Sequence, residues 1–256
     1  LLDISNLIKQ RNNKTLYALK INNDPEDTSG AKLLESAAKL ASATDNKLIQ
    51  IMKCDLNISN CIIDTVQANK ITDLIVGIHH KANIVDTFLG GTITALINGT
   101  SHQNLIIYGP KRPINSVKRL VVTVPQMAEL EIGFDLWFDR VKNIASQLSI
   151  PIVFYANKTT TEALKKQCEI HSSLNVSFRE LASWEDFLII SKDIKHSDTL
   201  IVITARKATM SYNNLFEKIP YYLNKYFADN NFLLIYPQQT APDGTDNDIY
   251  NPLKIS

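Results

Sequence analysis

Short runs of aliphatic and β-branched residues alternate with amphipathic segments along the whole 256-residue chain. Several runs, such as LIV at 74–76 and LVVTV at 120–124, are apolar almost throughout, which is typical of strands covered on both faces. The strands expected from this pattern are residues 15–21, 47–54, 73–78, 104–108, 118–124, 151–157, 175–181, 199–204 and 232–236. Strands that alternate with helices in this way predict an α/β protein built on parallel sheets.

The clearest helical stripe starts at Leu130 and continues to Leu148, with an apolar residue at every third or fourth position. This spacing predicts that one helix face packs on a sheet. Phe134 and Trp137 belong to the stripe, so we interpret them as core residues and not as contacts to a cofactor. Residues 1–9 have a shorter stripe of the same kind, which predicts a helix from the start of the chain.

Residue identities recur together with the order of the elements. Tyr17, Ala18 and Lys20 recur as Tyr155, Ala156 and Lys158; Leu74, Ile75, Val76 and Lys81 recur as Leu200, Ile201, Val202 and Lys207; Asn104, Tyr108 and Pro110 resemble Asn231, Tyr236 and Pro237. The sequence therefore predicts two copies of one unit.

The boundaries follow from this repeat. The first domain is expected at residues 1–113 and the second at 114–237, with the proline-containing segment 110–116 as the linker. A polar tail at 238–256 is expected to be disordered or loosely attached. The second copy would have five strands and the first only four, so we expect a fragment that begins after the first strand of its first copy.

Composition excludes several classes of function. The 27 basic and 26 acidic residues nearly cancel, so the chain has no charge that would draw it to nucleic acid. Cys54, Cys61 and Cys168 lack CxxC spacing and are interpreted as buried thiols in a reducing compartment. No segment approaches the roughly 18 apolar residues that a bilayer requires, and the start does not resemble a signal peptide. We expect a chain that is neither secreted nor inserted in a membrane.

The glycines are the most informative local feature. Five of the eight lie in the first copy after its predicted strand 73–78 begins, at Gly77, Gly90, Gly91, Gly99 and Gly109. A strand that ends at Gly77, followed by a loop and by Gly90-Gly91-Thr92 at a helix start, would direct backbone N–H groups toward a phosphate.

Three side chains of the same loop, His79, His80 and Lys81, could also meet an anion. A purely structural interpretation remains open, in which the glycines permit a tight turn and close helix packing. The second copy has no glycine between Gly133 and Gly244, and its corresponding segment 206–218 carries large side chains. Nucleotide is therefore not expected to bind there in the same way.

Catalytic motifs are missing from the sequence. It contains no GxSxG, GxxxxGK[ST] or HExxH motif and no set of protein-kinase motifs, so we expect no enzyme and no catalytic residue. His79, His80 and His102 are of a residue type that binds metal ions. Adjacent residues seldom converge on one ion, so no metal site is expected. Asp135 and Asp139, next to Arg140, are interpreted as a solvated helix face rather than a catalytic carboxylate pair.

The stretch from Gly77 to Thr92 and the repeated layout resemble the universal stress protein family, a five-stranded fold that is adenine nucleotide alpha hydrolase-like. Its nucleotide-binding members have glycine, two residues, glycine, nine residues, and then Gly-Ser or Gly-Thr. Here His80 replaces the second glycine, Gly91 stands at the hydroxyl position, and Thr92 comes one residue late. The resemblance implies ATP or AMP in the first domain only, held by Gly77, His79, His80, Lys81, Gly90, Gly91 and Thr92.

Residues 71–91, 133–141 and 212–227 are similar to the cytosolic C-terminal domain of bacterial cation (Na⁺ or K⁺):proton antiporters, in which two stress-protein-like domains follow a membrane transporter. This resemblance implies a cytoplasmic regulatory domain of an inner-membrane protein. Its partner would be the transporter domain upstream of Leu1 in the same polypeptide.

Stress-protein units commonly pair through their last strands. The two copies are accordingly expected to pair internally, through residues 104–108 and 232–236, and a homodimer would need another surface. Two alternatives stay open: a free-standing stress protein that binds ATP or AMP, and a nucleotide hydrolase. The transported ion and the regulatory ligand are not assigned.

Overall fold

The computed structural model describes residues 1–9, 15–24, 29–78, 91–170 and 174–240. Within this part of the chain, all nine predicted strands are present, with ends within two residues of their expected positions. The elements are α1 (Leu2–Ile8), β1 (Thr15–Asn22), α2 (Ser29–Ala43), β2 (Lys47–Cys54), α3 (Ile58–Ala68), β3 (Asp73–Gly77), α5 (Gly91–Gly99), β4 (Asn104–Gly109), η1 (Ile114–Ser116), β5 (Arg119–Thr123), η2 (Ala128–Leu130), α6 (Phe134–Leu148), β6 (Ile152–Ala156), α7 (Lys158–Ile170), β7 (Val176–Glu180), η3 (Trp184–Ile189), α8 (Ile190–Asp193), β8 (Asp198–Ile203), η4 (Asn214–Lys218), α9 (Ile219–Tyr226) and β9 (Asn231–Tyr236).

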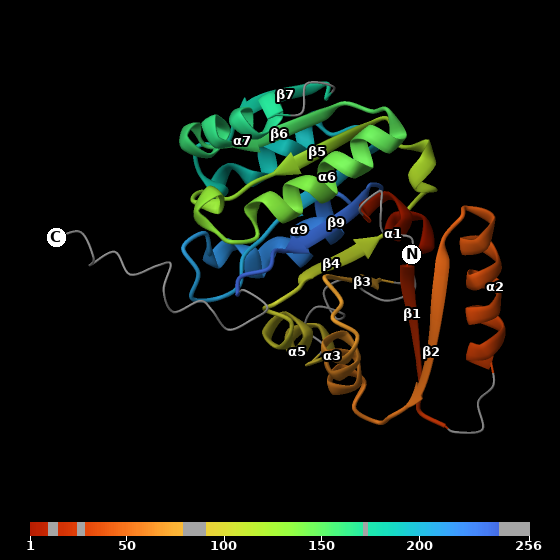
Figure 1. Ribbon diagram of the computed structural model, residues 1–256. Helices are drawn as coiled ribbons and strands as arrows, with labels where there is room; N and C mark the ends of the chain where they lie inside the picture. The colour runs from red at the N-terminus through yellow and green to blue at the C-terminus, as the bar shows by residue number, and fades with distance from the viewer. Residues whose placement is uncertain (10–14, 25–28, 79–90, 171–173, 241–256) are drawn as a thin grey trace.

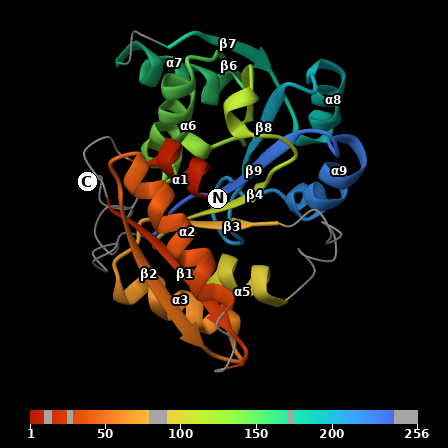
Figure 2. The same cartoon turned by 90° about the vertical axis from the view of Figure 1, so that its right-hand side faces the viewer.

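Seven strands form one sheet in the order β3-β4-β9-β8-β5-β6-β7, and β1 pairs with β2 in a separate parallel sheet (Figure 1). Every neighbouring pair in the large sheet is parallel except β4 and β9, which are antiparallel. Figures 1 and 2 show α6 and α9 on opposite faces of this sheet. The expectation of an α/β fold on mostly parallel strands is confirmed.

The antiparallel pair confirms the predicted contact between residues 104–108 and 232–236. Its register is symmetric: Ile107 faces Leu234 at the centre, and the pairs Leu105–Tyr236 and Gly109–Phe232 lie equally far on either side. Both strands are buried along their whole length. A homodimer would therefore need a surface other than these two strands.

Two asparagines at the starts of these strands make matching contacts across the pair. Asn104 Oδ1 accepts a hydrogen bond from the backbone N–H of Gln238 at 2.9 Å. Asn231 Oδ1 accepts from the N–H groups of Lys111 and Arg112 at 2.6 and 2.9 Å. Each asparagine thus holds the segment that leaves the opposite strand.

The core consists of two apolar clusters, one on each face of the large sheet. Residues of α1 and α6 form one cluster, in which Trp137 is fully buried and Phe134 nearly so, as the stripe predicted. Residues of α9 form the other cluster together with Phe187 and Trp184. The prediction for Leu130 is wrong: it lies in the 3₁₀ turn η2, before the helix begins at Phe134, and is 46% exposed.

Arg140 also departs from the expected solvated face. It is buried, and its guanidinium donates from Nε and Nη2 to the two carboxylate oxygens of Asp73, each at 2.9 Å. Asp73 additionally accepts from the side chains of Thr72 and Asn104. The helix pattern could not show this, because the carboxylate comes from β3, in the other half of the sheet. The neighbours Asp135 and Asp139 do bond to side chains at the surface, namely Gln167 and Lys142.

Arg206 makes a second cross-connection, from the segment after β8 to the end of α5. Its guanidinium donates to the carbonyl oxygens of Ile97 and Thr100, both at 2.7 Å, and also to those of Gln103 and Pro237. Burial lowers the pKa of Arg206 to about 10. The positive charge is balanced by the carbonyl groups at the carboxyl end of a helix, where a cation is favoured.

Two further expectations are corrected. Of the three cysteines only Cys61 is buried; Cys54 is exposed because it ends β2, at the edge of a two-stranded sheet, and Cys168 is half-buried. The tail is attached at its start: besides the contact between Gln238 and Asn104, the N–H of Gln239 donates to the Ser101 carbonyl at 2.9 Å. Residues 241–256 lie outside the described residues.

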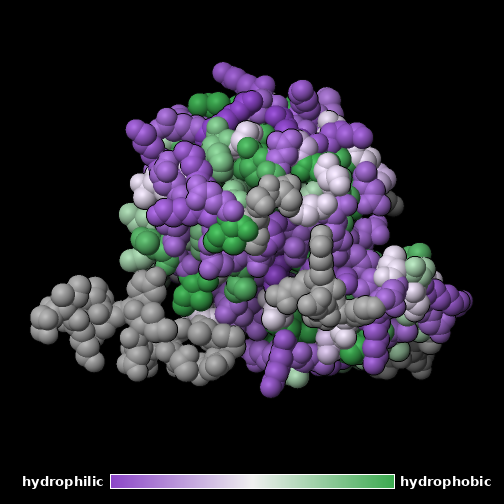
Figure 3. All heavy atoms as spheres, turned by 45° about the horizontal axis from the view of Figure 1, so that its top comes forward, coloured by the Kyte–Doolittle hydropathy of each residue, from purple (hydrophilic) through white to green (hydrophobic). Residues whose placement is uncertain are grey.

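The surface over the top of Figure 1 is mainly hydrophilic, with apolar side chains in small separate groups (Figure 3). Among the described helices, none combines the length and hydropathy needed for a membrane span.

Replacing Arg140 with methionine should lower the free energy of unfolding by about 3 kcal/mol, since the mostly buried carboxylate of Asp73 would lose its cation. Lys142→Met on the same helix is the control, because Lys142 pairs with the half-exposed Asp139 and such pairs contribute about 1 kcal/mol or less. Urea denaturation of both variants measures the difference. Equal losses would contradict a role for the buried pair in joining the two halves.

Arg206→Met should cost about 2 to 4 kcal/mol, because it removes the donors for several buried carbonyl groups at the end of α5. Arg206→Lys should restore only part of the loss, since an ammonium cannot reach the same set of acceptors. Lys207→Met, at an exposed position next in the chain, should leave the denaturation midpoint within error. If Arg206→Met left the free energy of unfolding unchanged, water would have to replace these contacts.

Candidate functional site

Three of the seven candidate ligand-binding residues lie in the described part of the chain. Gly77 is the last residue of β3, and Gly91 and Thr92 begin α5, both exposed. The other four, His79, His80, Lys81 and Gly90, lie outside the described residues, so the structure does not place them. The described residues on either side of this segment lie at the carboxyl end of a parallel strand, at Gly77, and in the first turn of a helix, at Gly91 and Thr92.

Ile78 fixes the position of the loop's first end. Its backbone N–H donates to the Tyr108 carbonyl at 2.9 Å, which extends the ladder between β3 and β4 beyond Gly77. A Cβ atom on Gly77 would lie 3.0 Å from a methyl carbon of Leu1. The glycine therefore leaves room for the side chain at the start of α1 to lie against the end of β3.

No packing contact of this kind explains the glycine at position 91. Among the described residues, none has an atom within 4 Å of a Cβ built at this position, and the first turn of α5 contains no acidic residue. The other end of α5 is closely packed, since a Cβ on Gly99 would clash with Ile63 of α3. Together with the Arg206 contacts, this packing fixes the helix and leaves its amino end accessible.

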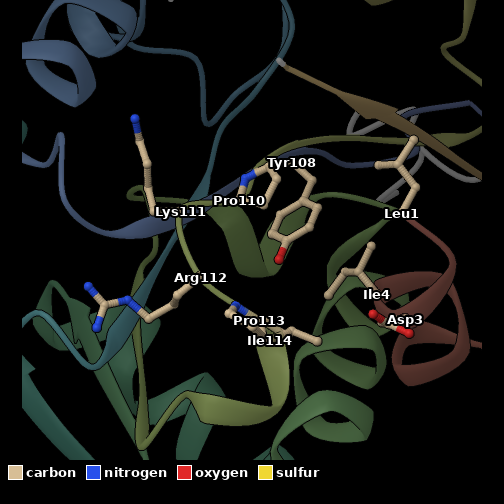
Figure 4. A pocket seen from close by; sticks show the side chains of 9 residues that line it. All are labelled: Leu1, Asp3, Ile4, Tyr108, Pro110, Lys111, Arg112, Pro113 and Ile114. Carbon is tan, nitrogen blue, oxygen red and sulfur yellow. The ribbon is translucent and has the colours of Figure 1, made fainter. Parts of the chain in front are cut away.

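A cavity of about 320 Å³ lies nearby, between the start of α1, the end of β4 and the segment that follows β4 (Figure 4). Figure 4 shows the Tyr108 ring pointing into the cavity, whereas the side chains of Lys111 and Arg112 extend away from it. Its wall is mostly apolar, and Asp3 supplies a carboxylate. The lining residues are Leu1, Asp3, Ile4, Tyr108, Pro110, Lys111, Arg112, Pro113 and Ile114.

Tyr108 is the buried polar group of this cavity. Burial and the negative charge of Asp3 raise its pKa to about 12, so the phenol stays protonated near neutral pH. A protonated phenol next to a carboxylate can donate and accept hydrogen bonds but does not act as a base. The cavity thus offers an apolar wall with one hydrogen-bonding phenol and one carboxylate.

The corresponding edge of the other half, at the carboxyl ends of β5 and β8, is closed by the protein itself. The Glu131 carboxylate accepts from both the backbone N–H and the hydroxyl of Ser211, each at 2.9 Å. A Cβ on Gly133 would clash with the carbonyl oxygen of Gln238, so the chain after β9 lies directly against the start of α6. An internal carboxylate therefore already accepts hydrogen bonds from this amide and this hydroxyl.

Sequence reasoning missed Glu131 and Arg206 as the groups that close this edge. The sequence marks Arg206 only as part of the segment 206–218, which carries large side chains. No sequence pattern singles out Glu131. Both residues bond to partners roughly 80 to 109 residues away, and no local pattern encodes those contacts.

The question of metal binding arises because the sequence contains His79, His80 and His102 as candidate ligands. No group of three or more His, Cys, Asp or Glu side chains within the described ranges could hold a metal ion. His102 contacts the Thr240 hydroxyl through Nδ1 at 2.9 Å.

No protein-family model matches the chain, and no curated protein sequence matches it. Solved structures do match. The cytoplasmic domain of a prokaryotic cation chloride cotransporter matches with a TM-score of 0.64 and 12% identity, over 92% of this chain and 89% of that one.

Two structures of stress proteins also match. A Pseudomonas aeruginosa protein described as a universal stress protein has a TM-score of 0.60 and 14% identity, over 93% of this chain and 88% of that one. A universal stress protein from Archaeoglobus fulgidus has a TM-score of 0.55 and 12% identity, over 88% and 86%. Identities this low establish the fold alone. The chain therefore has a universal stress protein-like α/β fold, and the cytoplasmic domain of a transporter is among its structural neighbours.

Proposed function

We propose that this chain is the cytoplasmic regulatory domain of a membrane cation:proton antiporter and that it is not an enzyme. The observation that carries the proposal is the match, over nine tenths of both chains, to the cytoplasmic domain of a cation transporter. The sequence resemblance of residues 71–91, 133–141 and 212–227 to antiporter tails supports it independently. The transporter would lie upstream of Leu1 in the same polypeptide, in the inner membrane.

We further propose that the chain consists of two tandem stress-protein-like units. The symmetric register of β4 and β9 supports this, because an offset of 127 residues relates Asn104 to Asn231 and Ile107 to Leu234. The matching contacts of the two asparagines have the same offset, from Lys111 to Gln238. In such an arrangement the first unit would contribute β1 to β4 and the second β5 to β9.

Regulation requires a ligand that binds two states of the domain unequally. An adenine nucleotide, ATP or AMP, fits the first unit better than the second. The amino end of α5 is accessible and has no acidic residue in its first turn, whereas Glu131 already occupies the Ser211 amide in the second unit. Anions are favoured at the amino end of a helix. The proposed ligand would thus bind one unit only and act on the transporter from there.

An antibody against this chain should detect a polypeptide in the membrane fraction of the source cells. That polypeptide should be much larger than the 28.8 kDa of the chain itself, since it would include the transporter. Resistance to extraction by carbonate and solubilisation by detergent are the controls for true membrane anchoring. A product of the chain's own mass in the soluble fraction would contradict the antiporter proposal and favour a free-standing stress protein.

ATP or AMP at 100 times its dissociation constant should stabilise the chain by about 2.7 kcal/mol, a rise in melting temperature of roughly 5 to 10 °C. Gly91→Glu should abolish the shift, because a carboxylate at the start of α5 repels the phosphates. Gly91→Ala is the matched control and should retain it, since a Cβ there meets open space. Differential scanning fluorimetry of the three proteins provides the measurement.

The result tests the ligand proposal separately from the transporter proposal. If no nucleotide at millimolar concentration shifts the melting temperature of the unchanged chain, the ligand proposal fails, while the transporter proposal still depends on the membrane experiment. If Gly91→Ala and Gly91→Glu retain the shift equally, the nucleotide binds elsewhere.

A further inference from the structure

The cavity beside α1 contains a buried tyrosine whose hydroxyl has no protein partner. Tyr108 is 4% exposed, and its ring points into the cavity (Figure 4). Among the residues that the structure describes, none forms a hydrogen bond with this hydroxyl. Because buried polar groups are nearly always hydrogen-bonded, an unpaired one that faces a cavity is available to a molecule bound there.

The corresponding place in the second half is closed. Leu1 and Gly133 directly precede α1 and α6, two helices that pack against each other on one face of the sheet. A Cβ on Gly133 would clash with the Gln238 carbonyl oxygen, because the chain after β9 lies against this helix start. The proposed repeat places Ile235 of β9 where β4 has Tyr108. The fold itself therefore does not require a cavity at this position.

Hydrogen bonds hold both walls of the cavity in place. Asn231 Oδ1 accepts from the backbone N–H groups of Lys111 and Arg112, which fixes the segment after β4. On the other side, the Ser5 hydroxyl donates to the Leu1 carbonyl at 2.9 Å in the first turn of α1. The cavity is therefore formed before a ligand binds, and this lowers the entropic cost of binding.

The lining favours a positively charged ligand. Asp3 is exposed at the cavity, and no cation among the described residues pairs with its carboxylate. Lys111 and Arg112 extend away from the cavity, so their charges do not enter it (Figure 4). The ring and hydroxyl of Tyr108 supply a π system and a hydrogen-bond acceptor, both of which attract cations. The rest of the wall is mostly apolar and includes Ile4.

The cavity is also separate from the proposed nucleotide site. Tyr108 and Ile4 belong to the apolar cluster on the face of the sheet that α6 covers. Ile93 and Leu96 of α5 belong to the cluster on the other face. The Asp3 carboxylate would repel a phosphate, so the same ligand does not suit both places.

We propose that this cavity binds a small organic cation, a protonated primary amine with an apolar body. Its ammonium group contacts the Asp3 carboxylate and the Tyr108 hydroxyl, and its body lies against the apolar wall. With about 320 Å³, the cavity is near the lower limit of ligand sites, which span roughly 300 to 1,000 Å³, so the amine is a small one. The inference does not depend on the proposed regulatory function.

Phenethylamine in its protonated form is the probe, because it joins one aromatic ring to one primary ammonium group. Titrated into the isotope-labelled chain, it should shift the NMR signals of the Ile4 and Ile114 amides, with a dissociation constant of roughly 1 mM or below. Phenethyl alcohol has the same body without the charge. It should bind at least about tenfold more weakly, since it forms no ion pair with Asp3.

Two variants and a matched control locate the bound amine. Asp3→Asn should raise the dissociation constant about tenfold, and Tyr108→Phe, which keeps the ring, about fivefold. Asp135→Asn is the control and should leave the affinity unchanged. Asp135 holds the same position in the first turn of α6 as Asp3 does in α1, but there the chain after β9 closes the corresponding place.

Three outcomes would overturn the proposal. Equal affinity for the alcohol would show an apolar cavity without a cation site. Full affinity in both Asp3→Asn and Tyr108→Phe would place the amine elsewhere on the chain. Unshifted Ile4 and Ile114 signals at ten times the expected dissociation constant would show that the cavity does not bind a small amine.

Discussion

The antiparallel pairing of β4 with β9 is the contact on which the rest of the molecule depends. Both strands are apolar and fully buried, so either one would expose an aggregation-prone edge if the other were absent. Because this pair reverses the strand direction, the carboxyl ends of β3 and β8 lie at opposite ends of the sheet. The carboxyl ends of the parallel strands therefore lie at two separate edges, one in each half.

The groups that reinforce this contact also make the two edges different. Arg206 follows β8, where the first half has its glycine-containing loop, and bonds to the end of α5 in that first half. Glu131 occupies the Ser211 amide and hydroxyl in the same region. The second edge therefore contributes contacts that hold the two halves together. Among the described residues, the helix start at Gly91 in the first half is exposed.

The same asymmetry extends to the strands. In the second half every strand except the outermost, β7, has two neighbours, whereas β1 and β3 each have one. Within the described strands, the first half therefore has fewer backbone hydrogen bonds between strands to lose, and such regions generally open at a lower cost in free energy.

The α/β class and all nine strands, with ends within two residues, could be predicted from the sequence. This was possible because apolar periodicity and turn residues act over short distances along the chain. The pairing of the two last strands was expected only from the resemblance to stress proteins. The burial of Arg140 against Asp73, the exposure of Leu130 and Cys54, and the contacts of Arg206 and Glu131 became visible only in the folded structure. Those outcomes depend on which distant backbone carbonyl or carboxylate folds into reach, and no local pattern carries that information.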